Sequence, residues 1–271
     1  MESNQPKVSA VMCTFRRFKC VERAMNCFIH QTYPNKELII YNTDTEFPYL
    51  HDEKLAMLGI KIINNSIDEV TNEPYTNVGA IRRDALKHAT GDYVATFDDD
   101  DIYLPWYMQQ AVDRMKQTGL PSFKPEKSFF YSGNNLRLVR NTLEASVIAS
   151  IHKVREYGYL LETGKEGLAW YTKMRDNREL TEHDDYYLPS YCFNWNDGNE
   201  MLAPHKQSGN INHPDNFEHH KAQSMDAVMN RGLSVYDEIH MEDFIYYPYY
   251  HFIYNNEQEF PSELVDKYLY P

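Results

Sequence analysis

The chain has 271 residues, enough for one large domain or two small ones, and its 42% hydrophobic and 25% charged residues are typical of a folded protein rather than a disordered one. Its formal net charge of −13 repels nucleic acid and anionic membranes on average. The four cysteines form no CxxC pair, so we expect no zinc site. No apolar run is long enough to cross a bilayer, so we expect no transmembrane segment, and we place the protein in the reducing cytoplasm.

The first half of the chain alternates between strand and helix patterns. Apolar runs at residues 8–13, 37–41 and 59–63 predict three buried strands. Apolar side chains at helical spacing between residues 21 and 29 predict a helix after the first strand. Cys20 and Cys27, seven residues apart in that segment, are expected to be small buried apolar residues rather than a disulfide pair.

A second helix and a fourth strand lead to four consecutive aspartates. The pattern over residues 79–88 predicts a helix that ends before Gly91, and residues 92–97 predict a strand. The aspartates at 98–101 follow that strand directly, and an amphipathic helix then runs to Met115. Strands that alternate with helices predict an α/β fold with a mostly parallel, Rossmann-like sheet and right-handed crossovers.

The pattern is less regular beyond about residue 120. Short strand-like segments are expected at residues 128–131 and 136–139, and a helix at 152–157. The rest of this half is expected to consist largely of loops rich in Tyr, Asn and His.

Three polar segments follow predicted strands, at residues 14–17, 42–44 and 98–101. Ligands of open α/β sheets bind beyond the carboxyl ends of the strands, so these segments are expected to meet at one edge of the sheet. They define the predicted ligand site.

The aspartate run has two interpretations. Neighbouring carboxylates raise one another's pKa, and a bound divalent cation relieves that repulsion; an all-oxygen ligand set suits Mg²⁺ or Mn²⁺. A solvated turn or the start of a helix also tolerates several acidic residues. The position directly after an apolar strand favours the metal site.

Several segments in order resemble the inverting family-2 glycosyltransferases, which have the GT-A fold of nucleotide-diphospho-sugar transferases. Residues 8–17, VSAVMCTFRR, resemble the opening strand and nucleotide loop of the family. Residues 31–40, QTYPNKELII, resemble the second strand of the family, and residues 81–101 resemble the stretch that ends in its metal-binding DxD motif. The similarity covers about the first 105 residues well and the remainder loosely.

The resemblance implies a metal-dependent transfer of a sugar from a nucleotide-diphosphate donor, and it assigns roles residue by residue. The implied donor-binding residues are Thr14, Phe15, Arg17, Asn42, Asp44, Arg82, Asp98 and Asp99. Within this set Asp98 would meet the ribose or the metal. Asp100 would chelate Mn²⁺ or Mg²⁺, and the late histidine of some relatives, which contacts metal or diphosphate, corresponds to His251.

One position departs from the family pattern. Where the family usually has an aspartate that reads uracil, this chain has Asn42 followed by Thr43. An asparagine can still hydrogen-bond the edge of a base, and Asp44 lies two residues further on. We therefore expect a UDP-sugar as the donor.

Inversion by single displacement needs a general base near the acceptor hydroxyl, normally a carboxylate. The segment 182–185, EHDD, resembles the ED-type motif that supplies it, and we predict Asp185 as the base, with Asp184 and Glu182 as alternatives. The pair Glu242 and Asp243 competes with them. A run of aromatic residues follows this motif and suits either stacking on a sugar or a base or packing in the core; it comprises Tyr186, Tyr187, Tyr191, Phe193 and Trp195.

Within one continuous domain, residues 1–119 would bind the donor and residues 120–271 the acceptor. A glycan is the expected acceptor, with protein or modified DNA bases as minority alternatives, and the oligomeric state stays open. Two other functions fit the sequence less well. A nucleotidyltransferase would usually carry a glycine-rich loop with a lysine, which residues 14–17 lack, and the intact aspartates argue against a binding protein without catalysis.

Overall fold

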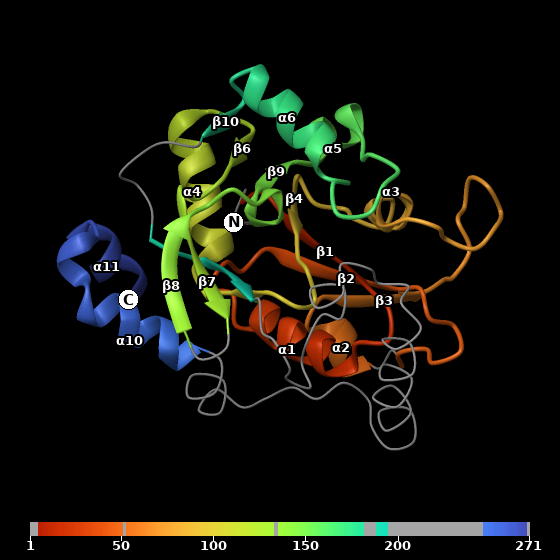
Figure 1. Ribbon diagram of the computed structural model, residues 1–271, viewed down its shortest axis with the longest axis horizontal. Coiled ribbons are helices and arrows are strands. Elements are labelled where there is room, and N and C mark those ends of the chain that lie inside the picture. Colours follow the sequence, from red (N-terminus) through yellow and green to blue (C-terminus); the bar gives the residue numbers. More distant parts are fainter. Residues whose placement is uncertain (1–4, 51–52, 133–134, 182–187, 195–245, 270–271) are drawn as a thin grey trace.

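The computed structural model describes residues 5–50, 53–132, 135–181, 188–194 and 246–269 (Figure 1). Its centre is a seven-stranded sheet in the order β10-β6-β9-β4-β1-β2-β3. These strands are β1 (Val8–Thr14), β2 (Lys36–Asn42), β3 (Ile60–Asn64), β4 (Tyr93–Thr96), β6 (Ser122–Phe123), β9 (Ile148–Ser150) and β10 (Leu180–Thr181).

Strands β1 to β4 are parallel to one another, as the alternating sequence pattern predicts. Strand β9 enters antiparallel between β4 and β6, which makes the sheet mixed rather than purely parallel. The α/β fold with a mostly parallel sheet is confirmed.

Helices cover both faces of this sheet (Figure 1). They are α1 (Phe18–Ile29), α2 (Glu53–Met57), α3 (Val78–Leu86), α4 (Tyr107–Thr118), α5 (Ile151–Tyr157) and α6 (Leu168–Asp176). Alternate residues of each strand point to opposite faces. Accordingly, Met12 of β1 lies in one buried cluster with α1, α2 and α4, whereas its neighbour Val11 lies in a second with α3, α5 and α6. Cys20 and Cys27 are buried free thiols on α1, as expected.

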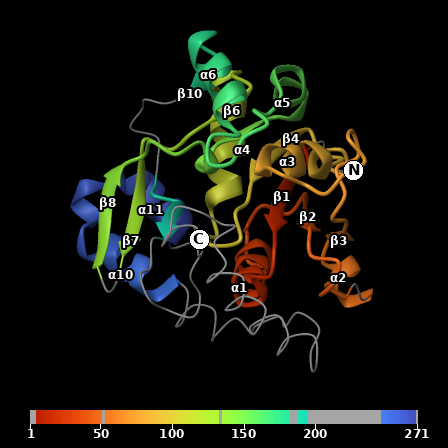
Figure 2. The ribbon, with the colours of Figure 1, turned by 45° about the vertical axis from the view of Figure 1, so that its right-hand side comes forward.

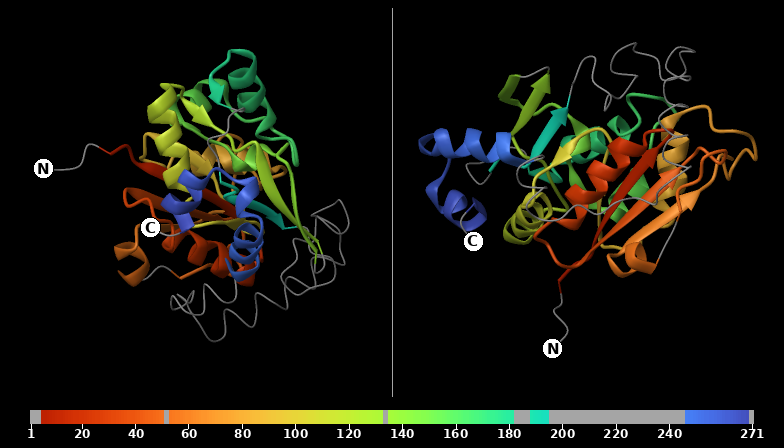
Figure 3. Two further views of the ribbon diagram at one scale, coloured as in Figure 1. Left: turned by 90° about the vertical axis from the view of Figure 1, so that its left-hand side faces the viewer. Right: turned by 90° about the horizontal axis from the view of Figure 1, so that it is seen from below.

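A second sheet of four strands stands beside the first, in the order β5-β11-β7-β8. Its strands are β5 (Ile102–Tyr103), β11 (Tyr191–Asn194), β7 (Lys127–Ser132) and β8 (Asn135–Arg140). Helix α10 (Tyr247–Asn255) packs on it through Phe129, whose ring centroid lies 5.5 Å from that of Tyr249 and 5.3 Å from that of Phe252. Figures 2 and 3 show α10 and α11 (Ser262–Leu269) on this side of the molecule.

Two features of this arrangement bear on the sequence predictions. The seven-stranded sheet takes strands from both sides of residue 119, so the boundary between donor and acceptor regions stays a prediction. Within the described part of the chain, no helix is long and apolar enough to cross a bilayer.

The loop of residues 158–167 packs on the start of α3 because residue 79 is a glycine. The backbone N–H of Gly79 donates to the carbonyl of Glu162 at 3.0 Å, and a Cβ at residue 79 would lie only 1.7 Å from the carbonyl oxygen of Leu160. The N–H of Val78 also donates to Thr163 Oγ1 at 3.3 Å. Only a residue without a side chain allows the loop to lie this close.

Replacing Gly79 with alanine should therefore displace the 158–167 loop. We expect the free energy of unfolding to fall by about 1–3 kcal/mol, the usual cost of adding a methyl group to a closely packed contact. The melting temperature should fall by several degrees, and trypsin should cut faster at the exposed Lys165. Gln117→Ala, at an exposed position of α4, is the control. Unchanged melting and cleavage in Gly79→Ala would show that the close packing is wrong.

Candidate functional site

A cavity of about 580 Å³ lies beyond the carboxyl ends of β1 and β4. The loop after β1, the aspartate run after β4, the start of α3, η1 (Glu144–Ser146), the 158–167 loop and β11 all contribute to its wall. Lining residues include Thr14, Phe15, Arg17, Thr43, Arg82, Asp98, Asp99, Asp100, Asp101, Glu144, Thr163, Glu166, Tyr191 and Phe193. The site therefore lies at the edge of the sheet at which the polar loops were expected to meet.

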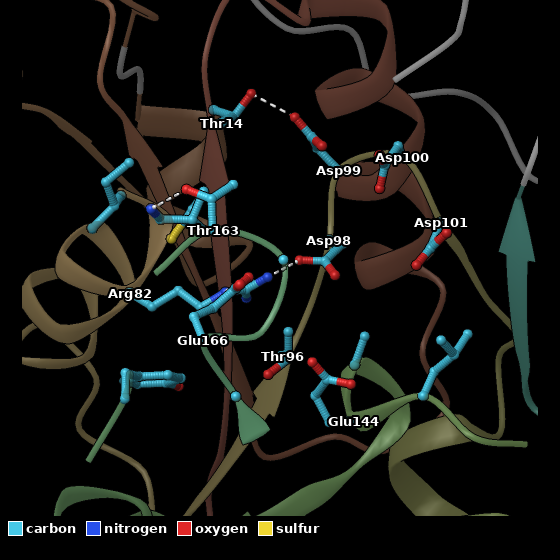
Figure 4. Close-up of a pocket in the computed structure, with 18 of the residues that line it drawn as sticks. Thr14, Arg82, Thr96, Asp98, Asp99, Asp100, Asp101, Glu144, Thr163 and Glu166 are labelled. Carbon is cyan, nitrogen blue, oxygen red and sulfur yellow. Dashed lines mark hydrogen bonds and ion pairs between the residues drawn. The ribbon is translucent and has the colours of Figure 1, made fainter. Parts of the chain in front are cut away.

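The aspartate run turns sharply after β4 and is fixed by aromatic packing. Phe97 is buried and stacks on Tyr103 with ring centroids 3.8 Å apart. The Tyr103 hydroxyl lies 2.7 Å from the backbone nitrogen of Asp98 and accepts a hydrogen bond from it. This anchor brings all four aspartates to the wall of the cavity, where Figure 4 shows them side by side.

Asp99 is held by two residues of the loop after β1. It accepts hydrogen bonds from Thr14 Oγ1 at 2.7 Å and from Arg17 Nη1 at 2.8 Å. Burial raises the pKa of Asp99 to about 6, because desolvation disfavours its charged form more than the Arg17 charge favours it, and the neighbouring Asp100 adds to the rise. Arg17 Nη1 also lies 3.3 Å from Asp100 Oδ2, so one guanidinium serves two carboxylates.

Asp101 differs from the other three aspartates because it joins the run to β11. Its carboxylate accepts from the Tyr191 hydroxyl at 2.5 Å and from the Asn194 backbone N–H at 3.0 Å. Both oxygens thus have protein donors. We infer that Asp101 connects the second sheet to the site and does not bind a ligand directly.

Arg82 of α3 connects Asp98 to a carboxylate that lies far away in the sequence. Its Nη2 donates to Asp98 Oδ1 at 2.6 Å and its Nε to Glu166 Oε1 at 3.1 Å (Figure 4). Arg82 is buried, and these two carboxylates raise its pKa against the opposing effect of burial. Sequence reasoning found Arg82 and Asp98 but missed Glu166.

A second carboxylate of the wall was also missed in the sequence. Glu144, at the start of η1, is half-buried, and desolvation raises its pKa. Neither Glu144 nor Glu166 lies in a recognisable motif, and only the fold brings them to the aspartates. Their separation in the chain explains why no spacing rule could reveal them.

The wall of the cavity is strongly acidic. Six carboxylates line it, from Asp98 to Asp101 and from Glu144 and Glu166, against the guanidinium groups of Arg17 and Arg82. A formal excess of four negative charges is thus gathered around one cavity. Oxygen ligands in an acidic setting fit a hard divalent cation such as Mn²⁺ or Mg²⁺.

The geometry also limits how such a cation would be held. In the part of the chain that the structure describes, no three acidic, histidine or cysteine side chains converge closely enough to form a metal site alone. Mg²⁺ sites in nucleotide enzymes typically use one or two carboxylates and complete the shell with phosphate oxygens and water. The residues fit a metal of that kind, which depends on a bound diphosphate.

The predicted nucleotide-binding residues fall into two groups. Thr14, Phe15 and Arg17 line the cavity, whereas Asn42 and Asp44 are buried outside its lining. Asn42 Nδ2 lies 2.9 Å from the Asp44 carbonyl and 2.9 Å from Asn64 Oδ1, and Asn42 Oδ1 accepts from the Asp44 N–H at 3.0 Å.

Asp44 likewise has internal partners. One carboxylate oxygen accepts from Arg16 Nε at 2.6 Å, and the other accepts from the backbone N–H groups of Glu46 and Phe47. Asn42 and Asp44 therefore organise the loop, and their neighbour Thr43 is the residue of this segment that lines the cavity. Spacing in the sequence could not reveal that these polar atoms are engaged within the loop.

The remaining predicted residues fall into three groups: one lies away from the cavity, several lie outside the described residues, and two line the cavity. His251 is exposed on α10, with its Nε2 at 3.0 Å from Asn255 Nδ2. The predicted base Asp185 lies outside the described residues, as do its alternatives Glu182, Asp184, Glu242 and Asp243, and the aromatic residues Tyr186, Tyr187 and Trp195. Of that aromatic run, Tyr191 and Phe193 line the cavity.

Comparison with known proteins agrees with this geometry. The model of the family "Glycosyl transferase family 2" matches residues 9–125, which carry β1 to β4 and the aspartate run. The UDP-Glc:alpha-D-GlcNAc-diphosphoundecaprenol beta-1,3-glucosyltransferase WfgD of Escherichia coli is 23% identical over 188 residues, which are 67% of each chain. The putative colanic acid biosynthesis glycosyl transferase WcaA of Escherichia coli K12 is 29% identical over 38% of this chain and 35% of its own.

Solved structures share the fold at low sequence identity. S. aureus TarS in complex with UDP-GlcNAc superposes with a TM-score of 0.53 at 15% identity, over 81% of this chain and 66% of that one. The mannosyltransferase PcManGT from Pyrobaculum calidifontis, in complex with GDP-Man and Mn²⁺, gives a TM-score of 0.51 at 12% identity, over 85% and 66%. The chain thus matches between 35% and 67% of the length of these four proteins. Residues 9–125 therefore resemble the family-2 glycosyltransferases, the curated relatives named here are glycosyltransferases, and the chain shares the fold of the solved GT-A structures.

Proposed function

We propose that this protein transfers a sugar from a UDP-sugar to a hydroxyl group of a glycan, with inversion at the anomeric carbon and with a divalent metal. The observation that carries the proposal is the acidic cavity at the carboxyl ends of β1 and β4. It combines carboxylates for a cation with two arginines for phosphate oxygens, the buried Arg82 and the partly buried Arg17. A nucleotidyltransferase or a binding protein without catalysis has no comparable support, because the relatives named above are glycosyltransferases.

Asp100, with Asp98 beside it, is proposed to hold Mn²⁺ or Mg²⁺. When bound, the cation acts as a Lewis acid that stabilises the nucleoside diphosphate as it leaves. PcManGT, a protein of the same fold, was solved in complex with GDP-Man and Mn²⁺, which supports a divalent metal. His251 stays a weaker candidate ligand, because it is exposed on α10 and is not among the residues of the cavity wall.

The arginines are proposed to orient the diphosphate. Arg82 is clamped between Asp98 and Glu166, so its guanidinium is preorganised and needs little further ordering when phosphate binds. Arg17 pairs with Asp99 and Asp100 and is proposed to turn toward a phosphate oxygen when a cation takes its place on these carboxylates. Thr14 and Phe15 would line the nucleotide on the β1 side.

UDP is the proposed nucleotide. WfgD uses UDP-Glc by its name, and TarS was solved with UDP-GlcNAc. Since Asn42 and Asp44 are engaged within their loop, the base would be recognised by the residues that do line the cavity, Thr43 and Phe15 among them.

The acceptor hydroxyl is proposed to lose its proton to Asp185. A single displacement at the anomeric carbon requires a carboxylate base on the face opposite the leaving diphosphate. The region after residue 119 is proposed to bind the acceptor. A glycan is favoured because the name of WfgD describes a sugar acceptor linked to a lipid diphosphate.

Replacing Asp100 with asparagine should reduce sugar transfer strongly and leave the fold intact. The change removes a negative charge at nearly constant volume, so kcat/KM should fall at least about a hundredfold, as for the loss of a metal-site carboxylate. Release of UDP from UDP-sugars with Mn²⁺ and a glycan acceptor is the assay, and the melting temperature checks folding. The matched control is Asp176→Asn, an exposed aspartate of α6. Transfer at the wild-type rate in Asp100→Asn would refute the metal assignment.

Metal binding should depend on the nucleotide. Because the described residues form no three-ligand group, Mn²⁺ alone should bind weakly, and UDP should tighten its binding by at least about tenfold through phosphate ligation. Electron paramagnetic resonance of free Mn²⁺, measured with and without UDP, gives both affinities. Uridine, which lacks the diphosphate, is the control ligand. Tight Mn²⁺ binding without any nucleotide would contradict this coupling.

A further inference from the structure

We propose that Glu166 binds the transferred sugar, accepting a hydrogen bond from one of its hydroxyl groups through Oε2. The inference rests on the proposed function, because it places the sugar of a nucleotide-sugar donor in the cavity. It goes beyond that function by naming a residue that selects the donor sugar.

The first observation is an unused acceptor in a buried place. Glu166 is 8% exposed and lines the cavity. Its Oε1 accepts from Arg82 Nε at 3.1 Å, whereas its Oε2 is buried and has no hydrogen-bond partner among the described residues. A buried charged oxygen without a donor costs free energy, so such an atom requires a partner, which can be a ligand group or an ordered water.

The second observation is that Glu166 is held rigidly. Its backbone carbonyl accepts from the Leu160 N–H at 2.9 Å, and its loop is fixed on the start of α3 through Gly79. Gly167 follows at once and lies so close to η1 that an added Cβ would be 2.8 Å from the side chain of Glu144. The backbone of Glu166 is therefore fixed, and the ion pair with Arg82 holds its carboxylate at the cavity wall.

The third observation identifies the chemistry of the missing donor. A phosphate would be repelled by a carboxylate, and a metal cation would be repelled by the Arg82 guanidinium, which already contacts Glu166. The cationic partner of Glu166 is already present as Arg82. A neutral hydroxyl group satisfies a carboxylate oxygen with one charge-assisted hydrogen bond.

The position agrees with a sugar rather than with a base or an acceptor. Arg82 contacts both Glu166 and Asp98, so Glu166 lies one side chain away from the carboxylates assigned to the metal and diphosphate (Figure 4). In a nucleotide-sugar the sugar is attached directly to that diphosphate. Glu166 is thus within the region that the first sugar ring would occupy.

The test compares UDP-sugars with UDP, in the presence of Mn²⁺, by calorimetry. UDP-glucose, UDP-galactose and UDP-N-acetylglucosamine are first ranked on the wild-type protein by thermal shift, and the most stabilising one becomes the probe. Glu166→Gln keeps the shape of the side chain but replaces one acceptor oxygen with an amide. The matched control is Glu162→Gln, an exposed glutamate of the same loop.

We expect Glu166→Gln to weaken binding of the probe by roughly tenfold to a hundredfold, as for loss of a hydrogen bond to a charged group, and to leave binding of UDP unchanged. Glu162→Gln should leave both affinities unchanged. A series of monodeoxyfluoro sugars locates the hydroxyl, because fluorine cannot donate a hydrogen bond. The analogue fluorinated at the contacted position should bind the wild-type protein more weakly than the parent sugar does. On Glu166→Gln, the same analogue should bind at least as tightly as the parent sugar.

Two results would overturn this inference and leave the proposed function intact. Equal affinity of wild-type and Glu166→Gln protein for the probe would show that Oε2 makes no sugar contact. A parallel loss for UDP and the probe would show that Glu166 acts only by positioning Arg82. If the wild-type protein bound neither UDP nor any of the three UDP-sugars, both the inference and the proposed function would fail.

Discussion

The site depends on one electrostatic constraint, the concentration of carboxylates at the end of β4. Four aspartates follow a buried strand, and Glu144 and Glu166 join them from elsewhere in the chain. Such a cluster is unfavourable in a buried wall unless cations or hydrogen-bond donors offset it. Much of the surrounding structure consists of groups that do so.

Three aspartates of the run have partners on different elements. Asp98 pairs with Arg82 of α3, and Asp99 with Thr14 and Arg17 of the loop after β1. Asp101 is bound by donors of β11 and connects the two sheets. Consecutive residues of identical chemistry thus acquire distinct roles, and these roles follow from the elements that each carboxylate faces.

The two arginines leave the cavity with an excess of negative charge, which explains why a divalent cation suits it. Their positions also explain how cation and diphosphate would depend on each other. Arg17 pairs with carboxylates that a metal would use, so it partly neutralises the negative charge of the site. A metal would therefore bind most tightly when phosphate oxygens complete its coordination shell. Arg82 stays clamped by Asp98 and Glu166 and provides a fixed positive charge.

The sequence by itself determined the alternation of strands and helices in the first half, because short continuous apolar runs alternate with apolar residues at helical spacing. It also placed Asp98 to Asp101 at a strand end, and the resemblance to a family followed from contiguous motifs. Two-residue strands such as β5, β6 and β10 carry no periodic signal, which is why they were not predicted. Only the tertiary structure decided which polar atoms are engaged within loops, as at Asn42 and Asp44, and which distant side chains reach the cavity, as at Glu144 and Glu166. Hydrogen bonds and packing between segments far apart in the chain fix these positions, and the spacing of residues in one sequence does not encode them.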